Sequence, residues 1–150
     1  MLKVGDKAPE FTLESDSGNQ VSLSDFKSKK VVLYFYPKDN TSGCTKEACS
    51  FRDNLEPISV QNTVVLGVSK DSIKSHQNFI NKYELNFPLL SDPEAKVCEA
   101  YGAWGEKKMY GKTYMGIKRM TFIINEEGNI QYIFTKVNTA DHAAEVMAQL

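Results

Sequence analysis

Two unbroken apolar runs constrain the fold of this chain more than any other feature. The first covers residues 31–36 (Val-Val-Leu-Tyr-Phe-Tyr) and the second covers residues 64–68 (Val-Val-Leu-Gly-Val). Continuous runs rich in β-branched and aromatic residues are typical of strands that are buried on both faces. Between the runs, apolar side chains recur at helical spacing from Cys44 to Leu55. The order strand, helix, strand predicts a parallel βαβ unit.

Short alternating runs and helix signals extend this pattern in both directions. Residues 11–13 and 21–23 predict an N-terminal hairpin, and residues 120–124 and 130–134 predict a second hairpin with a five-residue turn. The first expected helix ends before Pro57, and the second begins after the cap Ser72. A third runs from Pro93 to Gly102, and the last runs from Ala140 to Leu150 with Thr139 as its cap. We therefore expect a single α/β domain over residues 1–150. It is a thioredoxin-like fold with an N-terminal β-hairpin extension and a central mixed sheet flanked by helices.

Charge and hydropathy exclude several classes of function. The 18 basic and 19 acidic residues leave a net charge of −1, so no overall field attracts nucleic acid or an anionic membrane. The longest apolar run is far shorter than the ~20 residues that span a bilayer. Residues 1–7 lack the apolar core of a secretory signal, so we expect the cytoplasm, where thiols are reduced. The chain has three cysteines, an odd number. In a reducing compartment they are either buried apolar groups or redox groups.

The segment after the first apolar run combines the features of a reactive site. Pro37 ends the predicted strand, a polar loop follows, and a helix begins close to Cys44. Ligand sites in open α/β sheets lie beyond the carboxyl ends of strands. A cysteine in a first helical turn faces free backbone N–H groups and the positive end of the helix dipole, which favour the nucleophilic thiolate.

The helix alone does not ionise a thiol. A thiolate becomes dominant at neutral pH only with about 2.7 kcal/mol of stabilisation, whereas a helix terminus typically supplies ~0.3–1 kcal/mol. A fixed cation is needed, and the chain has only two arginines. Arg119 precedes a predicted core strand, and a guanidinium can donate to two acceptors at once. Arg52 lies about 12 Å further along the same helix as Cys44, so we expect a surface ion pair for it.

Cys49 introduces a geometric constraint. Two residues five apart in one helix have their Cα atoms ~8.6 Å apart, whereas a disulfide requires less than about 7 Å. We therefore expect a Cys44–Cys49 bond to form only if the start of the helix unwinds. An inert role for Cys49 stays open at this point, and Cys98, beside Val97 in an apolar helix, is expected to be a buried bystander.

The same residues resemble a known family. The pattern Pro37-x-x-x-Thr41-x-x-Cys44 is similar to the peroxidatic motif of the peroxiredoxins. A longer run resembles the subgroup named for bacterioferritin comigratory protein, or peroxiredoxin Q. That run reads Tyr34-Phe35-Tyr36-Pro37-Lys38-Asp39-Asn40-Thr41-x-Gly43-Cys44-Thr45-x-Glu47-x-Cys49. The resemblance extends over residues 5–11, 91–93 and 119–124 to the final helix.

The resemblance implies a thiol peroxidase that reduces hydrogen peroxide and organic hydroperoxides without metal, haem or flavin. Cys44 is then the peroxidatic thiolate and becomes sulfenic acid. Thr41 and Arg119 hold the peroxide oxygens, and Pro37 shields the pocket from water. Glu47 orients the arginine. The implied redox-active disulfide joins Cys44 to the resolving Cys49, and thioredoxin or a related dithiol protein reduces it. We expect a monomer.

One position departs from the subgroup, which usually has proline where this chain has Ser42. Serine should loosen the loop that enters the helix, because proline fixes φ. We expect a modest change in stability or rate, with activity retained.

Other sites and functions fit the sequence less well. Residues 111–113 resemble a P-loop end, but Glu106 stands where that motif needs glycine. The cysteines and the two histidines have no zinc-ligand spacing, and we expect His76 and His142 to be solvated. A thiol–disulfide oxidoreductase normally uses Cys-x-x-Cys, which is absent. A peroxide sensor or thiol–disulfide relay that uses the same cysteine pair stays open.

Overall fold

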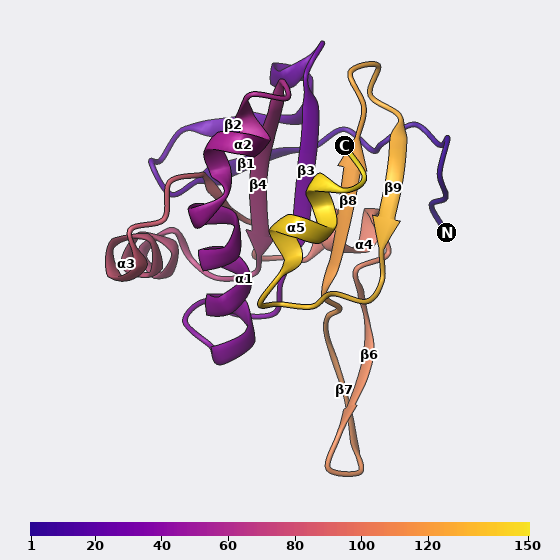
Figure 1. The fold of residues 1–150 in the computed structure, drawn as a ribbon. Coiled ribbons are helices and arrows are strands. Elements are labelled where there is room, and N and C mark those ends of the chain that lie inside the picture. The colour runs from indigo at the N-terminus through magenta and orange to yellow at the C-terminus, as the bar shows by residue number, and fades with distance from the viewer.

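A seven-stranded mixed sheet forms the centre of the computed structural model, which describes residues 1–150 (Figure 1). Its strand order is β2-β1-β5-β4-β3-β8-β9, and β6 and β7 form a separate two-stranded sheet. In chain order the elements are β1 (Thr12–Ser15), β2 (Gln20–Ser22), a 3-10 helix η1 (Leu23–Phe26), β3 (Lys30–Phe35), α1 (Ser42–Asp53), α2 (Leu55–Ser59), β4 (Thr63–Ser69), α3 (Ile73–Tyr83), β5 (Leu89–Ser91), α4 (Lys96–Ala100), β6 (Trp104–Met109), β7 (Lys112–Ile117), β8 (Met120–Ile124), β9 (Ile130–Phe134) and α5 (His142–Met147).

The predicted βαβ unit lies at the middle of the sheet. Strand β3 pairs in parallel with β4 and antiparallel with β8, while β4 pairs in parallel with β5. Both predicted hairpins are present, since β1 pairs with β2 and β8 with β9, each antiparallel. The expected mixed sheet with an N-terminal hairpin is therefore confirmed.

Alternation along β3 divides the interior into two cores. Val31, Leu33 and Phe35 belong to one buried cluster, which also contains Cys98 of α4. Val32 and Tyr34 belong to a second cluster, in which side chains of α1, α3 and α5 also pack. Successive side chains of a strand point to opposite faces, so a continuous apolar run supplies both cores at once. Figure 1 shows α1, α3 and α5 grouped on the near face of the sheet.

Several predicted helix boundaries are wrong. The first helix stops at Asp53, and Pro57 lies inside the next short helix, α2, instead of after the end of a longer one. Helix α4 begins at Lys96 and not at Pro93. The last helix begins at His142 with Asp141 as its N-cap, so Thr139 is not the cap. The predicted cap Ser72 is correct, because its side chain accepts a hydrogen bond from the amide of Ser75 at 3.1 Å.

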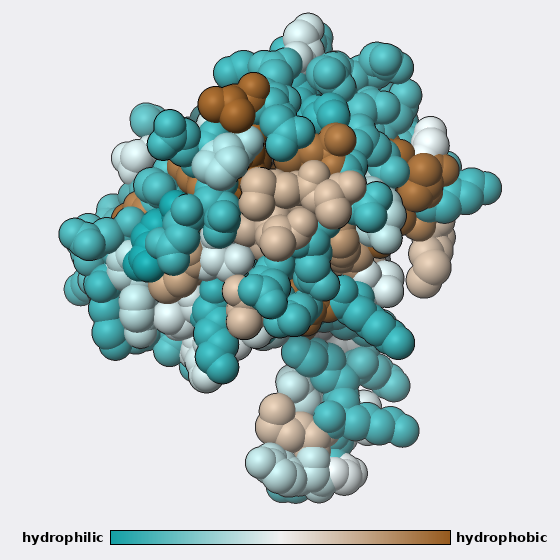
Figure 2. Space-filling model, viewed as in Figure 1, coloured by the Kyte–Doolittle hydropathy of each residue, from teal (hydrophilic) through white to brown (hydrophobic).

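Strands β6 and β7 form an arm that the sequence patterns did not predict. The two strands pair with each other over six residue positions, and the arm projects from the base of the sheet (Figure 1). Figure 2 shows it as a narrow projection that carries mostly hydrophilic side chains. At its tip, Tyr110 is 97% exposed, and Tyr110 and Gly111 both have positive φ. Gly111 thus lies in the turn of a hairpin and residues 112–113 begin its second strand, which agrees with the rejection of a P-loop.

None of the helices is both long enough and apolar enough to cross a lipid bilayer.

Candidate active site

The loop between β3 and α1 is fixed by a buried carboxylate. The side chain of Asp39 accepts a hydrogen bond from the Tyr36 hydroxyl at 2.5 Å and from the Ser75 hydroxyl at 2.8 Å. His76 Nδ1 lies 2.7 Å from the second Asp39 oxygen, which Ser75 also contacts. The amide of Asp39 donates to Asp71 at 2.8 Å. These contacts tie the loop to α3, so the loop delivers the chain to the start of α1 in one conformation.

Cys44 lies in the first turn of α1, as predicted, and is only 2% exposed. Its Sγ accepts a hydrogen bond from Nη2 of Arg119 at 3.2 Å. Burial disfavours a thiolate, whereas the free N–H groups of the first turn and a guanidinium hydrogen bond favour it. Arg119 is therefore the fixed cation that a thiolate needs in addition to the helix terminus.

Arg119 bridges two side chains on one face of α1. Its Nη1 donates to Oε1 of Glu47 at 2.5 Å, while Nη2 contacts Cys44. Residues three apart in a helix lie on the same face, so one planar guanidinium reaches both acceptors. A Cβ atom on Gly43 would lie 3.3 Å from Nη2 of Arg119, so the absence of a side chain there lets the guanidinium approach the helix.

The other arginine lies elsewhere. Arg52 donates to the Asp53 carboxylate at 2.8 Å and to the carbonyl of Tyr83 at 2.6 Å. This contact with Asp53 is the surface ion pair expected for it.

A further cation, Lys107 of β6, donates to the carbonyl of Ile117 at 2.9 Å. Burial lowers the pKa of Lys107, and the neighbouring Arg119 cation acts in the same direction.

Glu47 is completely buried, and only one of its oxygens has a hydrogen-bond partner. Burial raises its pKa to about 7, against the opposing effect of Arg119. Its free oxygen, Oε2, lies 3.8 Å from Nε2 of His142. The expectation that Glu47 orients the arginine agrees with this geometry, but the histidine behind it was not foreseen.

The expectation that both histidines are solvated is wrong. His76 and His142 have no exposed surface. His76 is held between Asp39 and the carbonyl of Leu90, which lies 3.0 Å from its Nε2. His142 lies between Thr121 and Glu145, with both contacts at 2.8 Å. The partners come from distant parts of the chain, so the periodicity of each helix does not reveal them.

Thr41 and Pro37 occupy the loop that leads into α1. Thr41 is the N-cap residue, but its hydroxyl donates to the carbonyl of Lys38 at 2.8 Å and does not cap the helix. Pro37 directly follows β3 and is half-buried. Ser42 is the first residue of α1, a position at which proline is well tolerated because the N–H has no partner in the helix.

The two remaining cysteines differ in their surroundings. Cys49 is half-buried and lies with Cys44 in the continuous helix α1, and all three cysteines are free. Cys98 is buried in the core on the opposite face of the sheet from Cys44. Burial raises the pKa of its thiol far above the ordinary value, with nearby Asp92 acting in the same direction. The expectation of a buried bystander agrees with this environment.

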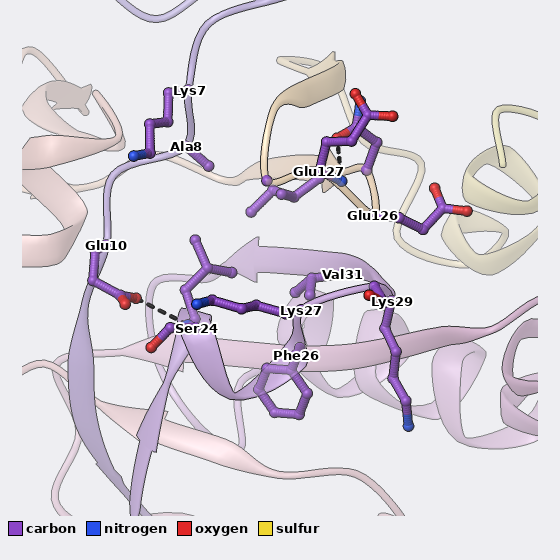
Figure 3. A pocket seen from close by; sticks show the side chains of 15 residues that line it. Lys7, Ala8, Glu10, Ser24, Phe26, Lys27, Lys29, Val31, Glu126 and Glu127 are labelled. Carbon is purple, nitrogen blue, oxygen red and sulfur yellow. Dashed lines mark hydrogen bonds between the residues drawn. The ribbon is translucent and has the colours of Figure 1, made fainter.

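A separate pocket, shown in Figure 3, lies at the other end of the sheet. It has a volume of about 500 Å³ and is lined by Val31 at the start of β3, Ile124 at the end of β8, and mainly polar residues. Cys44 lies beyond the opposite end of β3, so this pocket is separate from the thiol. Asp39, Asp71 and His76 bring their ligand atoms within 4.8 Å of one another, but these atoms are already hydrogen-bonded within the cluster.

Comparison with known proteins relates this geometry to a family. Residues 4–133 match the AhpC/TSA family. Peroxiredoxin Bcp of Bacillus subtilis is 48% identical over 149 residues, which cover 99% of this chain and 95% of that protein.

Two solved structures agree closely with the fold. The peroxiredoxin Q of Xylella fastidiosa, as a cysteine-to-serine mutant, superposes with a TM-score of 0.93 and 38% identity, covering 99% of this chain and 94% of the other. The bacterioferritin comigratory protein of Xanthomonas campestris, studied for its alkyl peroxide reduction, gives a TM-score of 0.87 and 40% identity. That match covers 92% of this chain and 88% of the other. The expected thioredoxin-like fold is thereby confirmed.

Proposed function

Because the chain belongs to the AhpC/TSA family and is a thiol peroxidase of the Bcp, or peroxiredoxin Q, type, we propose that Cys44 is its peroxidatic residue. The observation that carries this assignment is the 3.2 Å contact between Cys44 Sγ and Arg119. The thiolate attacks the terminal oxygen of a hydroperoxide, an S–O bond forms and the O–O bond breaks. The sulfur becomes sulfenic acid, and the leaving oxygen takes a proton to give an alcohol or water.

Arg119 and Thr41 act on the peroxide oxygens in this proposal. Negative charge moves from the sulfur to the leaving oxygen during the attack, and a guanidinium beside both atoms stabilises that charge at each stage. The Thr41 hydroxyl lies at the start of the same helix and turns from the Lys38 carbonyl to the bound peroxide. Glu47 fixes the orientation of the guanidinium, and Pro37 shields the thiol from water.

Cys49 is the resolving cysteine in this proposal. Its sulfur attacks the sulfenic sulfur of Cys44, a disulfide forms, and water leaves. Because both residues lie in α1, the first turn must unwind for the sulfurs to meet. Circular dichroism during oxidation by one equivalent of peroxide tests this step. We expect helical signal to fall in the wild-type protein and to stay constant in Cys49→Ser. An oxidised protein with an intact first turn would contradict the assignment.

The substrates are hydrogen peroxide and organic hydroperoxides, and a dithiol protein such as thioredoxin reduces the disulfide. The alkyl peroxide activity named for the Xanthomonas campestris relative supports organic substrates. We further propose that residues 1–150 act as one domain, as a monomer, in the cytoplasm. The central seven-stranded sheet, with a buried core on each face, supports the single domain.

Mass spectrometry after one equivalent of peroxide tests the cysteine roles together. We expect a Cys44–Cys49 disulfide in the wild-type protein and no rapid oxidation in Cys44→Ser. In Cys49→Ser we expect stable sulfenic acid at Cys44. A Cys44–Cys98 disulfide in that variant would transfer the resolving role to Cys98, and rapid oxidation of Cys44→Ser would refute the proposal.

A further inference from the structure

A buried row of ionisable side chains continues from Arg119 away from the thiol. Glu47 accepts from Arg119 through Oε1, while its Oε2 has no hydrogen-bond partner and lies 3.8 Å from His142 Nε2. Neither Glu47 nor His142 has any exposed surface. A buried carboxylate oxygen without a partner is unfavourable, so the gap between these two atoms requires an explanation.

The other contacts of His142 decide where its protons can lie. Its Nδ1 is 2.8 Å from Oε1 of Glu145, and a carboxylate only accepts, so Nδ1 carries a hydrogen. Its Nε2 is 2.8 Å from the hydroxyl of Thr121, which can donate or accept. In the neutral ring, Nε2 is therefore a lone pair that accepts from Thr121. If Glu47 is ionised, a lone pair of its Oε2 faces the lone pair of His142 Nε2, and neither atom can donate a hydrogen to the other.

One additional proton removes this conflict. It can lie on Nε2, so that an imidazolium donates to Thr121 and its positive charge faces the Glu47 carboxylate 3.8 Å away, or on Oε2, so that Glu47 is a neutral carboxylic acid beside the lone pair of Nε2. In both arrangements the Glu47–His142 pair has no net charge. Without the proton the pair carries one negative charge, which competes with the Cys44 thiolate for the cation of Arg119 and repels the thiolate.

The surroundings favour a neutral pair until about neutral pH. The charged or titratable groups around it are Cys44 on α1, Arg119 before β8, Tyr34 on β3 and Glu145 on α5, with Lys107 of β6 beyond Arg119. Burial raises the pKa of Glu47 to about 7 and lowers the pKa of His142. Tyr34 has a buried hydroxyl, and burial raises its pKa well above the ordinary value, so it stays neutral.

We propose that His142 is a positioning residue of this thiol peroxidase, which shares one proton with Glu47 and so directs the charge of Arg119 to the Cys44 thiolate. The proposal rests on the proposed roles of Cys44 and Arg119. It makes the last helix part of the active-site electrostatics, although His142 does not touch the thiol.

The pH profile of sulfenic acid formation tests the proposal. The rate is divided by the fraction of Cys44 that is ionised, which thiolate absorbance gives separately. In the wild-type protein we expect this rate per thiolate to fall roughly fivefold to tenfold across neutral pH, as the pair loses its proton. In His142→Gln the side-chain amide donates permanently to Glu47 and leaves it ionised. In that variant the rate per thiolate should equal the lower, alkaline value of the wild-type protein at every pH, with no change across neutral pH. A folded His142→Gln protein that keeps the wild-type step would overturn the proposal.

Ser50→Ala is the matched control for a purely structural role of α5. Ser50 accepts from the amide of Ala143 at 3.0 Å, so this variant loosens the same contact between α1 and α5 without changing a titratable group. We expect lower stability and an unchanged pH step. Loss of the step in Ser50→Ala would show that packing, not the proton, controls the rate.

Nitrogen-15 NMR of histidine in the wild-type protein needs no variant. We expect the Nδ1–H form of His142 at high pH, and a shift at Nε2 at the same pH as the rate step. An imidazole that is unaffected across this range would overturn the proposal. Failure of the cysteine assignments would appear differently, as oxidation of Cys44→Ser, and would leave the NMR titration unchanged.

Discussion

At the scale of single residues, the proposed chemistry depends on one cation, Arg119, that lies beside one sulfur, that of Cys44. Cys44 and Arg119 are 75 positions apart in the sequence, yet a guanidinium nitrogen lies 3.2 Å from the sulfur. Sequence reasoning could select Arg119, because a residue at the start of a core strand has a rigid anchor. It could not find His142, since the helical spacing of α5 says nothing about Thr121 or Glu47, which enclose the imidazole.

Arg119→Lys should reduce the rate of sulfenic acid formation by roughly 100-fold to 1,000-fold. A lysine ammonium keeps the charge but cannot donate in a planar fork to Cys44 and Glu47 together. Stopped-flow measurement of peroxide consumption by the reduced protein checks this. Arg52→Lys is the control and should react at the wild-type rate, because the Arg52 side chain donates to Asp53 and the Tyr83 carbonyl and not to the thiol. Equal losses in both variants would contradict the assigned role.

Glu47→Gln should change how stability depends on pH. The folded-state pKa of Glu47 is about 7, above the ordinary value of 4.5, so the folded protein binds this proton more tightly than the unfolded chain. The stabilisation is therefore complete at acidic pH and is lost as pH rises through 7. Relative to Glu47→Gln, the wild-type protein should lose roughly 3 kcal/mol from acidic to alkaline pH. Urea unfolding of both reduced proteins across this range measures the difference, and a constant difference would contradict it.

At the scale of elements, the sequence predicts those strands and helices whose buried residues follow a local apolar pattern. Strands β3 and β4 are continuous apolar runs, the N-terminal hairpin alternates, and β8 and β9 are mostly apolar runs on either side of a turn sequence at residues 125–129. The arm of β6 and β7 has no such pattern, because most of its residues are exposed and only its base, Trp104 and Ile117, packs against the core. Strand β5 has only three residues, which is too short for periodicity to detect. The ends of α2, α4 and α5 depend on turns that the apolar spacing does not define.

Ser42→Pro should stabilise the reduced protein by about 0.4–1 kcal/mol. Ser42 is the first residue of α1, and Thr41 before it has the extended backbone (φ −95°, ψ 160°) that a following proline requires. Urea unfolding measures the gain. Thr45→Pro is the matched control, because the Thr45 amide donates to the carbonyl of Thr41 at 2.8 Å. That substitution should cost about 3 kcal/mol, and a loss of stability in Ser42→Pro would contradict the expectation.

At the scale of the whole molecule, the sheet separates the thiols. Cys44 and Cys98 belong to cores on opposite faces, so a disulfide between them would require the sheet to open. Cys98→Ala should therefore leave steady-state peroxide turnover within about twofold of the wild-type value, while stability falls by roughly 1 kcal/mol because a buried sulfur is lost. A coupled assay with a dithiol protein as reductant measures turnover. A large loss of turnover in folded protein would place Cys98 in the catalytic cycle.

With Cys49 as the proposed resolving residue, the placement of Cys44 and Cys49 in one unbroken helix has a consequence for the fate of the oxidised protein. The sulfenic sulfur stays in its pocket until the first turn opens, and during that interval a second peroxide molecule can convert it to sulfinic acid. The stiffness of that turn therefore sets how much oxidant the protein survives. We therefore expect a chain with serine at position 42 to open its first turn sooner than one with proline, and to resist over-oxidation by peroxide better.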